Sequence, residues 1–113
     1  MHEMSICEGV VQVLEEEAVR SDFRRVSKVR LEIGALAAVE PEALMFSFDV
    51  VARGTIADGA VLEILNVEAA AWCFDCCETV PIASRLDDCP TCKGSRLKPT
   101  SGDELRIKDL EVA

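Results

Sequence analysis

Four cysteines form two identical pairs. Cys73 and Cys76 make one Cys-X-X-Cys turn and, after twelve intervening residues, Cys89 and Cys92 make a second. Each turn brings two thiolates to one side of a tight loop, and four sulfurs fill the tetrahedral shell that Zn²⁺ takes in structural sites. Because no position remains for water, such a site would hold shape and would not catalyse hydrolysis. The spacing predicts structural zinc, against the alternative of a redox dithiol or plain buried cysteines.

The other two cysteines are not predicted to bind metal. Cys77 directly follows Cys76, and its use as a ligand would lengthen the first turn to Cys-X-X-X-Cys, so we expect Cys76 to be the ligand. Cys7 falls within a predicted helix, where a small apolar residue or a spare thiol is the simpler interpretation. Neither residue therefore enters the predicted metal sites.

The only histidine of the chain is His2, next to the α-amine of Met1. The amine, the His2 backbone nitrogen and His2 Nδ1 can close two adjacent chelate rings on one metal ion if the amide is deprotonated. Ni²⁺ and Cu²⁺ favour such planar nitrogen donors, and Zn²⁺ does so much less. A histidine at this position also occurs without any metal role, so the pattern alone leaves both interpretations open.

The composition is that of a globular, acidic chain of 113 residues with 50% hydrophobic residues and a formal net charge of −9. An acidic surface lacks the counterion release behind most nucleic-acid affinity, so we expect no nucleic-acid partner. No apolar stretch approaches the roughly 20 residues of a membrane span, and the first residues do not resemble a signal peptide, so no membrane contact and a cytoplasmic location are expected. In that reducing compartment six cysteines indicate metal ligands or free thiols.

Catalytic motifs are missing from the sequence. It contains no GxxxxGK[ST] phosphate-binding loop, and only His2 could activate a serine or cysteine nucleophile. We therefore predict no catalytic residues and a protein that is not an enzyme.

Two helices are predicted to position these groups. A Ser-Ile-Cys-Glu capping box at residues 5–8 opens the first, which runs to about Arg20 with an apolar repeat at helical spacing. Pro41 opens the second, over residues 42–52. The predicted apolar positions are Ile6, Val10, Val13 and Leu14 in the first helix and Leu44, Phe48 and Val51 in the second.

Three strands complete the predicted framework. At residues 26–33 the period switches to two, with Val29, Leu31 and Ile33 on one side. Residues 61–67 are rich in β-branched and aliphatic residues, and residues 104–112 alternate again. The sequence thus predicts an α+β fold in which two helices pack on a small β-sheet.

The cysteine pairs lie in an insertion between the last two predicted strands. We expect residues 1–69 and 100–113 to form one α/β domain and residues 70–99 to form a zinc-ribbon-like module. The insertion carries too few apolar side chains to offset its chain entropy, so a metal must help to hold it.

Similarity to a known family extends over nearly the whole chain. The segments that carry it are, in order, Met1-His2-Glu3-Met4-Ser5, Val29-Arg30-Leu31-Glu32-Ile33-Gly34, Val39-Glu40-Pro41-Glu42-Ala43-Leu44, Phe46-Ser47-Phe48, Gly54-Thr55, Ala60-Val61-Leu62-Glu63-Ile64, the two cysteine turns and Gly102-Asp103-Glu104-Leu105. On these segments the chain resembles the HypA/HybF family of hydrogenase nickel-insertion accessory proteins. Its members begin with Met-His-Glu and carry a zinc domain with paired Cys-X-X-Cys turns.

The resemblance implies a nickel metallochaperone with two different metals. Transported Ni²⁺ falls on Met1, His2 and Glu3, with Glu40 as a further contact where the family has an acidic residue, commonly aspartate. Structural Zn²⁺ falls on the four paired cysteines, and Cys77 departs from the glycine usual after the first pair. The implied partners are a nickel-handling GTPase and the large subunit of [NiFe]-hydrogenase, with urease accessory proteins as alternative partners and a monomer or homodimer as the functional form.

Two competing functions share the cysteine pattern. One is a nucleic-acid-binding zinc ribbon, which the negative charge disfavours. The other is an interaction scaffold that binds zinc alone, with Met1 and His2 incidental. A blocked α-amine distinguishes the scaffold from the nickel carrier, because only the carrier would lose metal binding.

Overall fold

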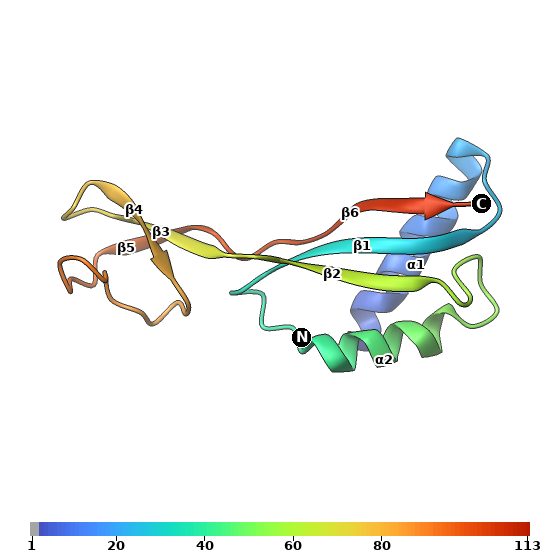
Figure 1. Ribbon diagram of the computed structural model, residues 1–113, viewed down its shortest axis with the longest axis horizontal. Helices are drawn as coiled ribbons and strands as arrows, with labels where there is room; N and C mark the ends of the chain where they lie inside the picture. Colours follow the sequence, from blue (N-terminus) through green and yellow to red (C-terminus); the bar gives the residue numbers. More distant parts are fainter. Residues whose placement is uncertain (1–2) are drawn as a thin grey trace. The chain divides into compact units, whose positions relative to one another are not determined.

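The computed structural model describes residues 3–113, which form two α-helices and six β-strands (Figure 1). In chain order the elements are α1 (Glu3–Ser21), β1 (Val26–Gly34), α2 (Pro41–Ala52), β2 (Val61–Val67), β3 (Ala69–Cys73), β4 (Glu78–Ile82), β5 (Leu97–Ser101) and β6 (Leu105–Val112). Two small sheets form, with strand orders β2-β1-β6 and β4-β3-β5. The predicted α+β class is therefore confirmed.

The chain divides into two compact units. The first, called the helical unit below, contains the residues up to Leu31 together with Val39–Ile64 and Ile107–Ala113. The second, called the cysteine unit, contains Glu32–Ala38 and Leu65–Arg106. The division falls within β1, β2 and β6, so each of these strands contributes residues to both units.

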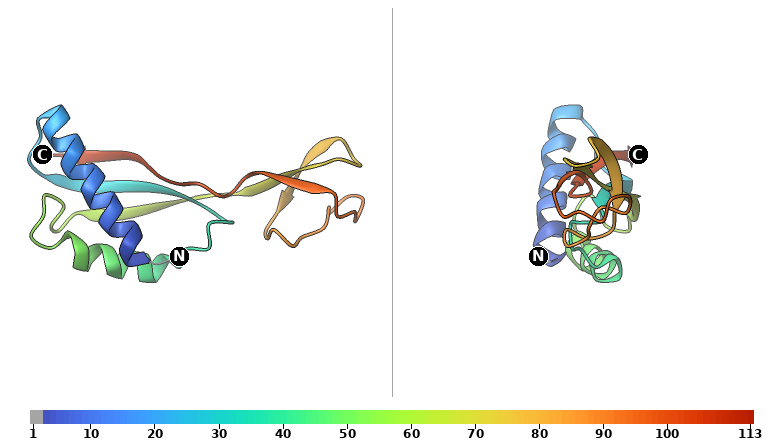
Figure 2. Two further views of the ribbon diagram at one scale, coloured as in Figure 1. Left: turned by 180° about the vertical axis from the view of Figure 1, so that it is seen from behind. Right: turned by 90° about the vertical axis from the view of Figure 1, so that its left-hand side faces the viewer.

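In the helical unit both helices pack on one face of the three-stranded sheet (Figure 2). β1 is the central strand, and Val29 and Leu31, which the alternation placed on one side, are buried in this unit. Ile33, predicted on the same side, is also buried, in the part of β1 that belongs to the cysteine unit. Leu44 and Phe48 of α2 are buried as predicted. The apolar face of a sheet covered by amphipathic helices explains this core.

α1 begins earlier than predicted. Glu3 is already helical, so Ser5 lies within the helix and the predicted capping box is wrong. The buried face consists of Cys7, Val11 and Leu14, whereas Val13, expected in the apolar repeat, is 48% exposed. The apolar residues of this helix follow two helical repeats that are offset by one residue, one beginning at Ile6 and one at Cys7. Packing against α2 and the sheet buries the repeat that begins at Cys7.

α2 begins and ends close to the predicted bounds. Pro41 occupies the first turn, where its missing amide needs no partner. The buried positions include Ser47 and Ala52, whereas Val51, expected in the stripe, is only half-buried. Of the helices in residues 3–113, none combines the length and apolarity needed to cross a membrane.

The cysteine unit is built on a second antiparallel sheet with β3 in the centre. Ala71 of β3 lies opposite Val80 of β4 and Pro99 of β5. Its buried cluster consists of Cys73, Val80 and Cys89, against which Cys76 and Leu97 pack. More than half of this cluster is cysteine, so little apolar surface holds the unit together.

Two glycines of the cysteine unit meet backbone to backbone. The Leu36 N–H donates to the Gly102 carbonyl at 2.6 Å, and the Gly34 N–H donates to the Glu104 carbonyl at 2.8 Å. A Cβ atom on Gly34 would overlap the Gly102 carbonyl, and Gly102 has φ +110°. Both positions therefore require glycine.

Candidate metal centres

Four thiols converge in the cysteine unit. Cys73 ends β3, Cys76 lies in the turn to β4, and Cys89 and Cys92 lie in the segment before β5. Their sulfur atoms all lie within 4.8 Å of one another. Sγ of Cys73 is 3.7 Å from Sγ of Cys92, and Sγ of Cys76 is 3.9 Å from Sγ of Cys89. The cluster thus brings together cysteines that are 19 positions apart, Cys73 and Cys92, and 13 positions apart, Cys76 and Cys89.

Backbone amides point at these sulfurs in the same way in both turns. The Cys76 N–H donates to Cys73 Sγ at 3.4 Å, and the Cys92 N–H donates to Cys89 Sγ at 3.5 Å. Hydrogen bonds of this kind favour the thiolate over the thiol, because they place a positive dipole end at the sulfur. Both turns are therefore built to carry anionic sulfur.

The residue after each pair closes its turn in a left-handed conformation. Cys77 has φ 56° and donates its N–H to the Cys73 carbonyl at 2.8 Å. Lys93 has φ 63° and donates its N–H to the Cys89 carbonyl at 2.9 Å. Glycine adopts positive φ at no steric cost, whereas a residue with a side chain is strained there. Cys77 and Lys93 therefore each carry some backbone strain. The matching geometry shows that the two turns are copies of one local structure.

Contacts between the two turns fix their spacing. Arg96 Nη1 lies 3.1 Å from Asp75 Oδ1, and the Phe74 N–H donates to the Arg96 carbonyl at 3.0 Å. Gly94 follows the second turn, where its N–H donates to Cys92 Sγ at 3.4 Å. A Cβ on Gly94 would lie 3.0 Å from Asp75 Oδ2, so a larger residue would press on this contact.

The four sulfurs do not ionise equally. The Cys92 N–H lowers the pKa of Cys89 to about 7 by donating to its sulfur. The pKa of Cys76 is raised, first by its interaction with the Cys92 thiol and then by burial. Four thiolates this close together repel one another unless a cation compensates their charge.

The cluster fits a Zn²⁺ ion. Thiolates at roughly 2.3 Å from a tetrahedral Zn²⁺ lie about 3.8 Å apart. This is close to the 3.7 Å between the sulfurs of Cys73 and Cys92 and the 3.9 Å between those of Cys76 and Cys89. All four donors are sulfur, which zinc accepts readily and which harder cations such as Mg²⁺ do not. The residues present therefore suit a closed structural zinc site.

A second set of candidate residues meets where the two helices begin. The Glu40 N–H donates to Glu3 Oε2 at 3.3 Å, and Glu40 Oε1 accepts the N–H of Glu42 at 3.3 Å. Glu3 is in the first turn of α1, and Glu40 is the N-cap of α2. The structure thus brings together two acidic residues that the sequence places 37 positions apart.

The other two predicted nickel ligands, Met1 and His2, lie outside the described residues. The contact between Glu3 and Glu40 is therefore the part of the predicted nickel site that the structure describes.

The two remaining cysteines stay outside the sulfur cluster. Cys7 is buried in the helical unit and its thiol donates to the Leu44 carbonyl at 3.5 Å. Burial, aided by the negative charge of Glu3, raises the pKa of Cys7 to about 11. Cys77 is exposed, with its thiol 3.6 Å from the Phe74 carbonyl. Cys76 rather than Cys77 contributes the fourth sulfur.

Several supporting residues escaped the sequence-based prediction. The ion pair between Asp75 and Arg96 and the left-handed conformations of Cys77 and Lys93 were not expected. The two left-handed conformations could have been predicted from the sequence, because Cys77 and Lys93 each directly follow a Cys-X-X-Cys pair. The contact between Glu3 and Glu40 had no such signal, since only the packing of α1 on α2 creates it.

Comparison with protein families gives a match over almost the entire chain. The family described as "Hydrogenase/urease nickel incorporation, metallochaperone, hypA" matches residues 1–112. The hydrogenase maturation factor HypA of Azorhizobium caulinodans is 58% identical over 112 residues, covering 99% of both chains. The protein of the same description from Beijerinckia indica is 56% identical over 112 residues, again with 99% of both chains covered.

Comparison with solved structures gives the same fold. The solution structure of the Ni metallochaperone HypA from Helicobacter pylori matches with a TM-score of 0.72 at 23% identity, covering 99% of this chain and 97% of that one. A second solution structure, described as HypA protein, matches with a TM-score of 0.74 at 24% identity, covering 100% and 97%. At these identities the matches establish the architecture.

Proposed function

Because the chain belongs to the HypA family of hydrogenase and urease nickel-incorporation metallochaperones, we propose that it binds Ni²⁺ at its N-terminus and delivers it to [NiFe]-hydrogenase. The proposed ligands are the Met1 amine, the His2 backbone and imidazole nitrogens, and Glu3. The observation that carries the proposal is the hydrogen bond from the Glu40 N–H to the Glu3 carboxylate, which joins two of the residues proposed to contact nickel.

The proposed nickel site leaves one coordination position that Met1 and His2 do not fill. Three nitrogen donors from Met1 and His2 leave one position of a planar Ni²⁺ to be filled by Glu3, Glu40, water or the receiving protein. Glu3 already accepts the Glu40 N–H through its carboxylate, which favours its backbone nitrogen as the donor to nickel. A site with an exchangeable position permits transfer by stepwise replacement of ligands.

Glu40 is the residue best placed to act as the additional contact. It caps α2 in extended conformation, with φ −85° and ψ 113°, and one of its oxygens, Oε1, is engaged by the Glu42 N–H. The other carboxylate oxygen takes no part in that hydrogen bond. We propose that Glu40 steadies the bound nickel rather than supplying the main binding energy.

The proposed role of zinc is structural. Cys73, Cys76, Cys89 and Cys92 would hold it, and four thiolates would leave no coordination position for substrate. Zinc would supply a cross-link between the two cysteine turns in place of an apolar core. In this proposal residues 1–69 and 100–113 serve the nickel cargo, and residues 70–99 hold zinc.

The proposed partners are those of nickel insertion. The chain would receive or pass Ni²⁺ in contact with a nickel-handling GTPase and the large subunit of [NiFe]-hydrogenase, with urease accessory proteins as alternative clients. A net charge of −9 favours the binding of a cation and of partner proteins with positively charged surfaces. We propose a cytoplasmic, non-enzymatic carrier with no catalytic residue of its own.

Calorimetric titration with Ni²⁺ tests this proposal on tag-free, zinc-loaded protein with a native Met1. We expect one Ni²⁺ per chain, lost in His2→Ala and lost when the α-amine is acetylated, with the zinc content unchanged in both. Glu40→Gln should weaken nickel binding by roughly tenfold, as removal of a supporting contact typically does. Glu42→Gln is the matched control, because Glu42 begins the same helix and should leave nickel affinity unchanged.

Equal nickel binding by wild type and His2→Ala, or its absence from both, would remove the N-terminal site. The zinc-binding scaffold would then be the better account. A dependence on pH adds a second check, since the imidazole must be neutral and the amide deprotonated to bind. Nickel should dissociate as the pH falls through the histidine range near 6.5, and a flat titration there contradicts the proposed ligands.

A further inference from the structure

The outer face of α2 is apolar at its centre, where a surface helix usually carries polar residues. The buried residues of this helix recur at helical spacing from Leu44 to Ala52 and form its inner face. On the opposite face Met45 is 49% exposed and Phe46 is 68% exposed. Because burial is what makes an aromatic side chain stabilising, Phe46 contributes little to the stability of this chain. Two adjoining exposed apolar side chains on one helix face are instead typical of a contact site.

No other element of the helical unit covers this face in the part of the chain that the structure describes. Figures 1 and 2 show α2 at the margin of the helical unit, with α1 and the sheet on one side of it. The contact with α1 is made on the inner face, where the buried Cys7 thiol donates to the Leu44 carbonyl. Met45 and Phe46 therefore remain available to another molecule.

Negative charge is concentrated at the start of this face. Within residues 3–113, Glu3, Glu40 and Glu42 enter no ion pair. Each helix dipole places only about half a positive charge at its start, so three carboxylates leave an excess of negative charge there. Further along the same face the carboxylate of Asp49 is offset by Arg53, at 3.1 Å. The uncompensated charge thus lies at the end of the face that adjoins Glu40.

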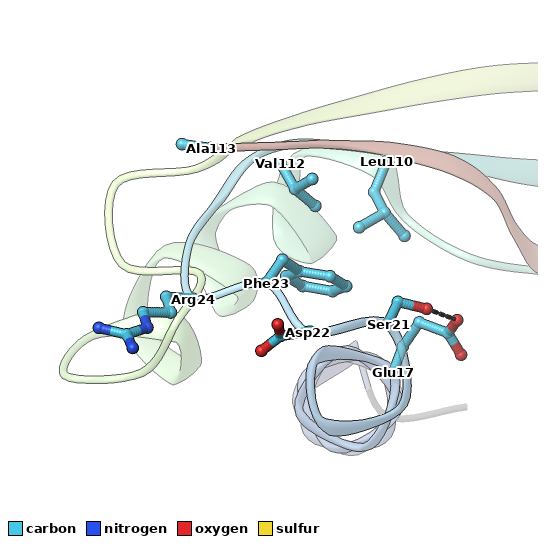
Figure 3. Close-up of a pocket in the computed structure, with 8 residues that line it drawn as sticks. All are labelled: Glu17, Ser21, Asp22, Phe23, Arg24, Leu110, Val112 and Ala113. Carbon is cyan, nitrogen blue, oxygen red and sulfur yellow. Dashed lines mark hydrogen bonds between the residues drawn. The ribbon is translucent and has the colours of Figure 1, made fainter.

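A second apolar surface of the helical unit differs in its charge. Figure 3 shows a groove of about 720 Å³ at the end of α1, where Phe23 lies beneath two aliphatic side chains of β6. Two carboxylates and two guanidinium groups are present around it, those of Glu17, Asp22, Arg20 and Arg24. Glu17 and Arg20 are paired at 2.8 Å. The groove is therefore balanced in charge, whereas the α2 face selects for a positively charged occupant.

We propose that the outer face of α2 is the docking site of a partner protein, through a segment of that partner in which apolar side chains alternate with Lys and Arg. Met45 and Phe46 would pack against the apolar side chains, and a Lys or Arg of the segment would pair with Glu42. Methionine and aromatic residues are enriched at such contacts. Charge decides between occupants, because a second copy of this chain, with a net charge of −9, would bring the same acidic face.

The position of this face deepens the proposed function and rests on it. Glu40 is the N-cap of α2, and Phe46 lies six residues further along the helix. Six residues of α-helix rise about 9 Å, so a segment bound at Phe46 also reaches Glu40. A partner docked on α2 would therefore stand beside the residue proposed to steady the nickel ion. The same partner could then supply the ligand that replaces water or a carboxylate during transfer.

Fluorescence anisotropy on the zinc-loaded, nickel-free chain tests the docking site. The probe is a labelled synthetic amphipathic helix of Leu and Lys, compared with the same peptide in which Glu replaces Lys. We expect saturable binding of the Leu–Lys peptide, with a dissociation constant at least about tenfold higher in Phe46→Ala, as for truncation of a central aromatic contact. Leu86→Ala is the matched control, since it removes an apolar side chain that is 92% exposed in the cysteine unit.

A charge reversal tests the electrostatic part of the recognition. Glu42→Lys should raise the dissociation constant of the Leu–Lys peptide by about fivefold at low salt, the upper range for one exposed pair. The effect should shrink at high salt, because screening weakens interactions between exposed charges. Glu15→Lys makes the same charge change at an exposed position of α1 and should have a smaller effect.

Three results would overturn the proposed docking site. They are equal peptide binding by wild type and Phe46→Ala, no binding of the Leu–Lys peptide, and equal binding of the Leu–Glu peptide. If Phe46→Ala changed self-association but not peptide binding, a second copy would be the occupant, and the proposal would again be wrong. Because Phe46 is exposed, the variant should keep its fold, which zinc content and thermal unfolding confirm.

Nickel titration separates a failure of this inference from a failure of the proposed function. Phe46→Ala should still bind one Ni²⁺ per chain, since Phe46 is not among the proposed ligands. Nickel binding without peptide binding would remove the docking site and leave the carrier function in place. Peptide binding that depends on Phe46, in a chain that binds no nickel, would remove the carrier function and support the docking site.

Discussion

The helical unit and the cysteine unit hold their folds together by different means. Buried side chains of the helical unit are mostly large and aliphatic or aromatic, including Leu14, Val29, Leu31, Leu44 and Phe48. The buried cluster of the cysteine unit has one aliphatic member, Val80, beside Cys73 and Cys89. Hydrophobic burial can fold the first unit, whereas the second needs a metal in place of the missing apolar surface. Stability and nickel handling should therefore respond to different perturbations.

Removal of the zinc ligand Cys76 should produce the largest effect of any single change. Cys76→Ser, or chelation of the metal, removes a stabilisation on the order of 10 kcal/mol or more, so the cysteine unit should unfold. In two-dimensional amide NMR spectra we expect the signals of Ala71 and Val80 to collapse while those of Leu14 and Val29 keep their positions. Cys77→Ser is the control and should leave the spectrum intact, since Cys77 lies outside the cluster. Loss of all dispersed signals together would show that the two units fold as one.

A cavity in the helical unit should have the converse effect. Leu14 is fully buried, so Leu14→Ala should destabilise this unit by about 2–5 kcal/mol in denaturant unfolding. The zinc content should not change, because the four sulfurs belong to the other unit. Val19→Ala, on the same helix at 86% exposure, should change stability by no more than about 0.5 kcal/mol. Loss of zinc from Leu14→Ala would show that the stability of the cysteine unit depends on that of the helical unit.

Relief of backbone strain in the cysteine turns should give a smaller, stabilising effect. Cys77 has φ 56° where glycine would be unstrained, so Cys77→Gly should stabilise the cysteine unit by up to about 1 kcal/mol. Lys93→Gly, at the matching position of the second turn, should act with the same sign. Thermal unfolding of zinc-loaded protein measures both. A decrease in midpoint for either variant would mean that the side chain contributes more than its strained backbone costs.

Thiol reactivity should give the smallest and most local difference between the units. With zinc bound, only the exposed Cys77 should react rapidly with a thiol reagent near neutral pH. Cys7 should stay unreactive because it is buried and its pKa is raised to about 11. Its folded pKa exceeds the unfolded value of 9.0, so the stability that the neutral thiol contributes is full below pH 9 and is lost between about pH 9 and 11. Two rapidly reacting thiols at neutral pH would contradict this.

Local sequence patterns predicted most of the framework. Alternation located β1, the β-branched run gave β2 its observed bounds, and Pro41 marked the start of α2. Ser5 misled the prediction, because a capping residue can be accommodated inside a helix when an earlier residue begins it. The strands of the cysteine unit were missed as separate elements, since they are short and two of them contain proline.

The candidate sites were predictable to different degrees. Paired cysteines constrain each other through metal geometry, so their spacing alone indicated the cluster that the structure brings together. The meeting of Glu3 with Glu40 depends on how α1 packs against α2, and no local pattern encodes a contact across 37 residues.

X-ray absorption spectroscopy at the nickel and zinc edges tests the central claim most directly, on tag-free protein loaded with one equivalent of each metal. That claim is a division of metals between the two units. The zinc spectrum should fit four sulfur ligands, and the nickel spectrum should fit only nitrogen and oxygen ligands, with the nickel signal altered in His2→Ala and the zinc signal unchanged. Sulfur ligation of nickel, or nitrogen and oxygen ligation of zinc, would contradict the assignment of cargo to the N-terminus and of structural metal to the cysteines.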